Sequence, residues 1–164
     1  MIKKINYLFV TMFGIGNISR IPGSIASLIT VLILLFVFNF LNIQANYVLF
    51  IIIIIFIVSI FSINIFIKEK ENKDPKEIVI DEFVGQSIPI CLYEVGHSNE
   101  NTFTQTLTIY FIMFILFRLF DIIKPYPVSY YDKNFKNGFG VVMDDVCAGL
   151  YVVVILVLYM TIFS

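Results

Sequence analysis

The chain has 164 residues, of which 59% are hydrophobic and 14% are charged, and its formal net charge is −1. Soluble domains contain about 45–50% apolar and about 25% charged residues. A soluble fold of this length is therefore excluded, because its interior cannot hide so much apolar surface. The near-neutral charge offers no basic excess for nucleic acid, and the mean hydropathy of +0.93 indicates an integral membrane protein.

The first segment, MIKKINYLFVTMFG, allows two interpretations. Two lysines followed by apolar residues resemble a signal peptide, but no small-residue cleavage site follows them. A loop rich in glycine and proline follows instead. We therefore expect the segment to belong to the mature protein as a short helix at the membrane interface.

The rest of the chain contains several segments long enough to span a bilayer, which takes roughly 20 apolar residues per helix. We predict an all-α, polytopic membrane helical bundle of about five spans. It forms a single domain over residues 1–164, without internal repeats. The predicted spans cover residues 27–41, 47–67, 75–93, 103–123 and 146–163.

The third span is expected to be short or kinked and to begin before its apolar part. Asp74 is a suitable N-cap, Pro75 suits the first helical position, and Glu77 completes a capping box. This pattern predicts a helix that starts near Pro75. Pro89 is expected to kink it.

Lysine and arginine are distributed unevenly among the loops. They occur in segments 1–20, 68–82 and 124–145 and are absent from loops 41–46 and 94–105. Basic residues favour the cytoplasmic side, so the N-terminus is predicted inside and the C-terminus outside. The motifs that adjoin the predicted cytoplasmic helix ends are FGIGNISRIPGS, IDEFVG, RLFDIIKPYP and MDDVCAG.

These motifs carry five carboxylates that the topology brings to one face. Each charge at membrane depth costs about 2.5–3.5 kcal/mol on insertion scales. Clustered carboxylates also repel one another unless a cation lies between them. Oxygen ligands suit a hard ion such as Mg²⁺ or Mn²⁺. The predicted metal ligands are Asp81, Glu82, Asp121, Asp144 and Asp145. Taken singly, Asp144 is equally compatible with a helix N-cap and Asp145 with a first-turn acid.

Two cations lie close to Asp121 on the same helix face. Arg118 precedes it by three residues and Lys124 follows it by three. One interpretation is a salt-bridged pair at a helix end. The other is that Arg118 and Lys124 bind phosphate oxygens, while Asp121 binds metal or orients the arginine.

The loop before the first span is a candidate anion site. It contains Arg20, Gly23 and Ser24, and its backbone N–H groups together with the positive end of the following helix suit an anion. Glycine and proline also mark ordinary turns. Gly85 and Gly149 follow Asp81 and Asp145 by one turn, which allows close helix approach.

If the site acts on a phosphate ester, the sequence excludes mechanisms that use a histidine or a cysteine nucleophile. His97 is the only histidine and is predicted in an outer loop, away from the acids. Cys91 and Cys147 have no CxxC spacing and no arginine six residues later. Water activated by a metal, or an aspartate nucleophile, remains.

In their order and spacing, the four motifs resemble the phosphatidylglycerophosphatase A family over nearly the whole chain. The first loop departs from the family pattern, since PGSIAS stands where similar proteins often read PGTxGS. The resemblance implies a Mg²⁺-dependent enzyme of the inner membrane, whose active site faces the cytoplasm. The implied reaction converts phosphatidylglycerophosphate to phosphatidylglycerol and phosphate.

The resemblance also implies metal and catalytic roles for the five acids, without dividing these roles among them. The predicted catalytic residues are Asp81, Asp121 and Asp145, with Asp145 as the candidate general base and Asp132 as a weaker one.

Two alternatives belong to other functional classes. A divalent-cation transporter or channel would also explain intramembrane acids, but it requires a polar path across the bilayer. The outer halves of the spans, such as VLFIIIIIF, are uniformly apolar. A lipid-binding structural subunit would need no metal cluster. The sequence indicates no particular oligomeric state.

Overall fold

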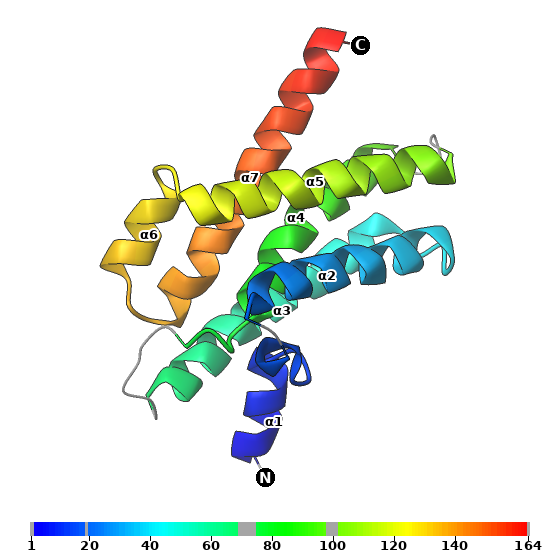
Figure 1. The fold of residues 1–164 in the computed structure, drawn as a ribbon. Helices are drawn as coiled ribbons and strands as arrows, with labels where there is room; N and C mark the ends of the chain where they lie inside the picture. Colours follow the sequence, from blue (N-terminus) through cyan, green and yellow to red (C-terminus); the bar gives the residue numbers. More distant parts are fainter. Residues whose placement is uncertain (1, 19, 69–74, 98–101, 164) are drawn as a thin grey trace.

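The computed structural model describes residues 2–18, 20–68, 75–97 and 102–163 (Figure 1). These residues form seven α-helices and the 3-10 helix η1 (Ile15–Asn17), without a strand, so the all-α prediction is confirmed. The helices are α1 (Ile2–Val10), α2 (Pro22–Asn39), α3 (Ala45–Ile67), α4 (Ile80–His97), α5 (Phe103–Ile123), α6 (Val128–Asn134) and α7 (Gly138–Phe163).

Four helices, α2, α3, α5 and α7, are long and apolar enough to cross a membrane. Helix α4 is the remaining predicted span, and its 18 residues measure about 27 Å. It carries acids in its first turn, which lower its apolar content. The prediction of about five spans therefore agrees with the structure.

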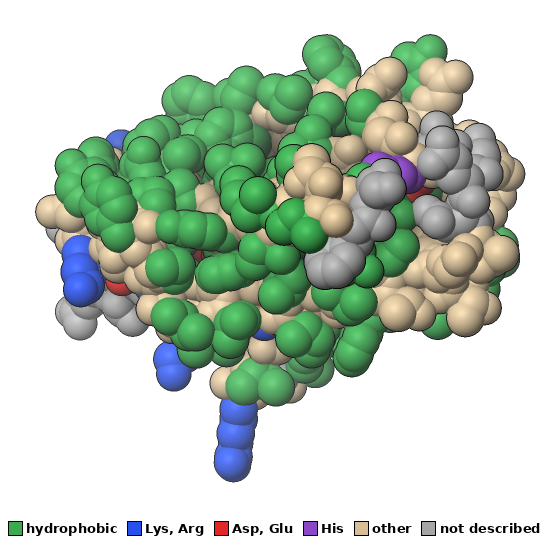
Figure 2. All heavy atoms as spheres, turned by 90° about the horizontal axis from the view of Figure 1, so that it is seen from above, with side chains coloured by type: hydrophobic (Ala, Val, Ile, Leu, Met, Phe, Trp, Pro, Cys, Tyr) green, Lys and Arg blue, Asp and Glu red, His purple; other side chains and the backbone are tan. Residues whose placement is uncertain are grey.

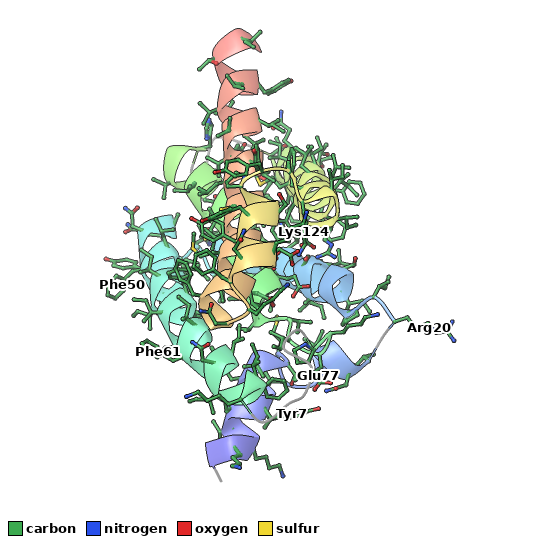
Figure 3. The ribbon with its side chains drawn as sticks, turned by 90° about the vertical axis from the view of Figure 1, so that its left-hand side faces the viewer. Tyr7, Arg20, Phe50, Phe61, Glu77 and Lys124 are labelled. Carbon is green, nitrogen blue, oxygen red and sulfur yellow. The ribbon has the colours of Figure 1, made fainter. Side chains whose placement is uncertain are left out.

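The surface of the bundle is mainly apolar, as lipid contact requires. Figure 2 shows a face covered by hydrophobic side chains, with lysine and arginine side chains at its left end and lower edge. In Figure 3, Phe50 and Phe61 of α3 point away from the other helices, and both are largely exposed. Exposed aromatic side chains of this kind suit a hydrocarbon environment.

Helix α4 lies at the centre of the bundle and packs against α2, α3, α5 and α7 (Figure 1). Its contact with α7 depends on two glycines. A Cβ atom at Gly85 would lie 2.6 Å from the carbonyl oxygen of Asp145, and one at Gly149 would overlap the carbonyl oxygen of Gly85. The predicted close approach at both glycines is confirmed.

The predicted start of the third helix near Pro75 is wrong. Residues 75–79 form a turn in which the N–H of Ile78 donates to the carbonyl of Pro75 (3.0 Å). The N–H of Val79 donates to the carbonyl of Val10 (3.0 Å). This tertiary hydrogen bond uses a donor that a longer helix would need, and α4 begins at Ile80. The predicted cap, Asp74, lies outside the described residues, whereas Pro89 lies inside α4 as predicted.

The last helix begins at Gly138, eight residues before the predicted start of the fifth span. Two glycines in its first turn disfavour helix, but the N–H of Gly138 donates to Asn64 Oδ1 of α3 (2.8 Å). Asp144 and Asp145 consequently lie in the second turn of α7. The interpretation of these acids as an N-cap and a first-turn acid is wrong.

The N-terminal segment is helical, as predicted, and it packs against α3. Asn6 of α1 donates from Nδ2 to the carbonyl of Ser62 (3.0 Å). The following loop was expected to extend to the first span and to include Gly23 and Ser24. Helix α2 instead begins at Pro22, a residue suited to the first helical position, so both residues lie in its first turn.

Candidate active site

A cavity of about 380 Å³ opens where the first turns of α2 and α4 meet the end of α5, α6 and the second turn of α7. The structure brings all ten sequence-predicted site residues to its lining. They are Arg20, Gly23, Ser24, Asp81, Glu82, Arg118, Asp121, Lys124, Asp144 and Asp145. Segments separated by more than 100 residues therefore meet at one end of the bundle.

Three of the acids form a compact carboxylate triad. Asp81 and Glu82 of α4 and Asp145 of α7 each place one oxygen so that all three lie within 4.8 Å of one another. Asp81 and Asp145 are 9% and 4% exposed. The close packing of α4 on α7 at Gly85 supplies this juxtaposition, since Gly85 contacts Asp145 itself.

The triad contains two buried oxygens without hydrogen-bond partners among the described residues. These atoms are Asp81 Oδ1 and Glu82 Oε2. Buried acceptors of this kind are costly when they remain unpaired. Three adjacent carboxylates also repel one another in a poorly hydrated site. The triad has the composition of a binding site for a hard cation.

The other two predicted metal ligands are paired with basic side chains. Asp121 Oδ2 lies 2.8 Å from Arg118 Nη1, and Asp144 Oδ2 lies 2.8 Å from Lys124 Nζ. Both acids line the cavity, but neither belongs to the triad. Of the two roles considered for Asp121, orientation of the arginine matches this geometry.

Arg118 lies between the triad and α2. Its Nη1 atom is 3.8 Å from Glu82 Oε1 and donates to Ser27 Oγ (3.4 Å). Sequence reasoning did not identify Ser27. It follows Gly23 by one helical turn on α2. Residues at this spacing share a helix face, so the spacing is a signal in the sequence that could have placed Ser27 near the site.

Lys124 ends α5 in a left-handed backbone conformation (φ 48°). Its Nζ atom contacts Asp132 Oδ1 (2.7 Å) as well as Asp144. Burial alone would lower the pKa of Lys124, but the Asp144 and Asp132 carboxylates outweigh burial and raise it above the usual value. The two carboxylates therefore favour the positively charged form of Lys124, which lines the same cavity as the triad.

Gly23 and Arg20 occupy different parts of the cavity. A Cβ atom at Gly23 would overlap Glu82 Oε1 and lie 3.2 Å from Arg118 Nη1. The absence of a side chain thus lets α2 approach the acids. Arg20 is exposed, and Figure 3 shows its side chain directed away from the helices, whereas Lys124 lies among them.

Known proteins with related sequences are phosphatases. The family profile described as Phosphatidylglycerophosphatase A matches residues 8–160. The chain is 30% identical to Phosphatidylglycerophosphatase A of Haemophilus influenzae, over 94% of this chain and 91% of that protein. It is 28% identical to Phosphatidylglycerophosphatase A of Escherichia coli, over 88% of this chain and 77% of that protein.

A shorter similarity involves a putative phosphatidylinositol-3-phosphatase of Bacteroides thetaiotaomicron. It reaches 42% identity, over 48% of this chain and 45% of that protein. No solved structure matches the chain. The family match covers both the acidic triad and the basic residues beside it. The chain belongs to the phosphatidylglycerophosphatase A family and is a phosphatase.

Proposed function

We propose that this phosphatase hydrolyses phosphatidylglycerophosphate to phosphatidylglycerol and phosphate, with Mg²⁺, at the cytoplasmic face of the inner membrane. The observation that carries this proposal is the buried triad of Asp81, Glu82 and Asp145 beside Arg118 and Lys124. Such a site combines ligands for a hard cation with donors for a phosphate group. The names of the two full-length relatives support the choice of substrate.

The residues of the triad fit a magnesium ion. All donors are carboxylate oxygens, which Mg²⁺ prefers, and two buried oxygens lack partners among the described residues. Asp81, Glu82 and Asp145 would hold the ion. When bound, Mg²⁺ supplies Lewis-acid polarisation of the phosphoryl oxygens.

The basic side chains have a separate task in this proposal. Arg118 and Lys124 place two positive charges beside the triad, where they can neutralise charge that develops on the phosphoryl oxygens. Asp121 and Asp144 hold these cations in place through contacts of 2.8 Å. We assign these two acids to positioning rather than to metal binding.

Asp145 remains the proposed general base. Its carboxylate belongs to the triad, and its backbone N–H donates to Asp144 Oδ1 (3.0 Å). Asp144 is in turn bonded to Lys124. This chain of contacts fixes the α7 turn that carries Asp145, so that its carboxylate, once freed of contact with the ion, can accept a proton within the cavity.

The cytoplasmic location is supported by the distribution of basic residues. Lys76, Lys124 and Lys136 line the cavity, and basic residues favour the cytoplasmic side of a membrane. At the other end of the bundle, loop 41–46 contains no lysine or arginine.

Phosphate release by the purified protein tests the proposal. Candidate substrates are phosphatidylglycerophosphate, phosphatidic acid and phosphatidylinositol 3-phosphate, each assayed with Mg²⁺ and with a chelator. We expect release to be fastest from phosphatidylglycerophosphate and to stop when Mg²⁺ is removed. Fastest release from phosphatidylinositol 3-phosphate, or release that chelation leaves unchanged, would contradict the substrate or the metal respectively. Divalent-cation uptake into proteoliposomes without phosphate release would support the transporter alternative.

A further inference from the structure

One part of the cavity rim is apolar, although the interior carries charged side chains of both signs. Ile21, just before α2, and Ile122, near the end of α5, both line the cavity. They are 63% and 71% exposed. Ile21 is two residues from Gly23, which packs against Glu82. Ile122 follows Asp121, which is paired with Arg118. We call Ile21 and Ile122 the isoleucine rim.

The isoleucine rim lies at the ends of two neighbouring spans. Helices α2 and α5 contact each other and run side by side in Figures 1 and 3. Both are long and apolar enough to cross a membrane, and their outer surfaces carry exposed apolar residues such as Leu28 and Leu119. The rim therefore continues a surface suited to lipid contact.

Another part of the rim is basic. Lys76, in the turn before α4, and Lys136, between α6 and α7, line the same cavity and are exposed. Lys136 Nζ donates to the carbonyl of Asp132 (2.7 Å). These lysines lie outside the apolar helices, so this part of the rim suits water and the released inorganic phosphate.

From this asymmetry we propose that the isoleucine rim is the lateral opening through which the acyl chains of the lipid substrate reach the bilayer. The inference rests on the proposed function and adds the orientation of the substrate within the site. A lipid phosphate must bring its phosphate to the triad while its acyl chains remain in hydrocarbon. The α2–α5 side of the cavity satisfies both requirements, because exposed apolar residues there line the same cavity as Arg118 and Glu82.

A single tryptophan tests the opening directly, because the chain contains none. Ile122→Trp places an indole on the rim, where its bulk narrows the opening. We expect its fluorescence to be quenched by phospholipids brominated on their acyl chains and only weakly by aqueous iodide. We expect kcat/KM for long-chain phosphatidylglycerophosphate to fall at least tenfold. For a short-chain, monomeric analogue it should change less than twofold.

Ile115→Trp is the matched control. Ile115 lies seven residues earlier on the same face of α5, is 49% exposed, and is absent from the described cavity lining. Its indole should also be quenched by brominated lipid, while hydrolysis of both substrates stays within twofold of wild type. Ile21→Trp approaches the opening from α2 and should reproduce the selective loss.

Several outcomes would overturn the opening. One is that iodide, rather than brominated lipid, quenches the Ile122→Trp indole. Another is that both rim variants hydrolyse the long-chain substrate at the wild-type rate. A third is that hydrolysis of the long-chain and the short-chain substrate falls equally. Failure of the wild-type protein to hydrolyse either lipid would instead contradict the proposed function. The quenching measurements would then still decide whether the isoleucine rim faces lipid.

Discussion

At the scale of single residues, the candidate site depends on charges held at short distances inside an apolar bundle. Asp81, Glu82 and Asp145 gather negative charge, whereas Arg118 and Lys124 each pair with an acid outside that triad. The five predicted acids thus divide into two groups with different partners. Neutral and charge-conserving substitutions can separate their roles.

Replacement of triad acids by nearly isosteric amides separates metal binding from packing. We expect Asp81→Asn and Asp145→Asn each to lower phosphate release by about 10²–10³-fold, the effect of losing one main electrostatic contact. Without Mg²⁺, their melting temperatures should equal or exceed that of wild type, because one repelling charge is gone. Thermal unfolding with and without Mg²⁺ should show a smaller stabilisation by the ion in each variant. Wild-type turnover in both variants at saturating Mg²⁺ would contradict the metal assignment.

Arg118→Lys keeps the positive charge but removes the planar guanidinium, whose Nη1 atom contacts Asp121, Glu82 and Ser27. Because lysine cannot reproduce this planar geometry, we expect activity to fall by about 10²–10³-fold. Initial rates of phosphate release, normalised to folded protein over a Mg²⁺ titration, measure the effect.

Lys124→Arg is the control for that substitution. Lys124 acts as a point charge between Asp132 and Asp144, so arginine should cost at most about tenfold in rate. An Arg118→Lys enzyme within about threefold of wild type, under 1 kcal/mol, would remove Arg118 from the phosphate site.

At the scale of elements, α4 and α7 hold the triad together through backbone contact at two glycines. Gly85 faces Asp145, and Gly149 faces Gly85. The spacing of the triad is therefore a property of helix packing as much as of the acids themselves.

Gly85→Ala should separate α4 from α7. A methyl group there would lie 2.6 Å from the Asp145 carbonyl oxygen and 2.8 Å from Phe117, so the helices must shift. Overpacking of this kind costs about 1–3 kcal/mol. We expect lower thermal stability together with lower phosphate release. Gly96→Ala, on the same helix, is the control because, among the described residues beyond its own stretch of helix, no atom lies within 4 Å of its added methyl. Equal stability of the two variants would show that the α4–α7 contact is not tight.

At the scale of the whole molecule, the cavity lies at one end of the bundle, and the uncharged residues 40–44 connect α2 to α3. The orientation of the bundle in the membrane decides whether the site faces the cytoplasm. Native cysteines do not interfere with labelling, since Cys91 and Cys147 are buried.

Cysteines at two exposed positions test this orientation. We expect a membrane-impermeant maleimide added outside whole cells to label Asn42→Cys but not Lys136→Cys. In inverted membrane vesicles the pattern should reverse, because basic segments stay in the cytoplasm. Labelling of both positions from one side would contradict the proposed topology and the cytoplasmic active site.

The sequence by itself determined the class of the protein and most of its spans, and it predicted residues that line one cavity. Apolar runs indicate helices wherever they are long, and acids inside such runs are too costly to be incidental. The span predicted at 103–123 coincides with α5, and all ten predicted site residues line one cavity.

Only the tertiary structure decided where α4 and α7 begin and how the acids divide. The start of α4 depends on a hydrogen bond to Val10, and the start of α7 depends on Asn64. A local sequence pattern does not predict hydrogen bonds to partners so distant in the chain. Likewise, Asp121 and Asp145 have the same side chain, but Asp121 is paired with Arg118, whereas the packing of Gly85 brings Asp145 into the triad. Their roles differ because side-chain chemistry is local, whereas the distances between charges are set by helix packing.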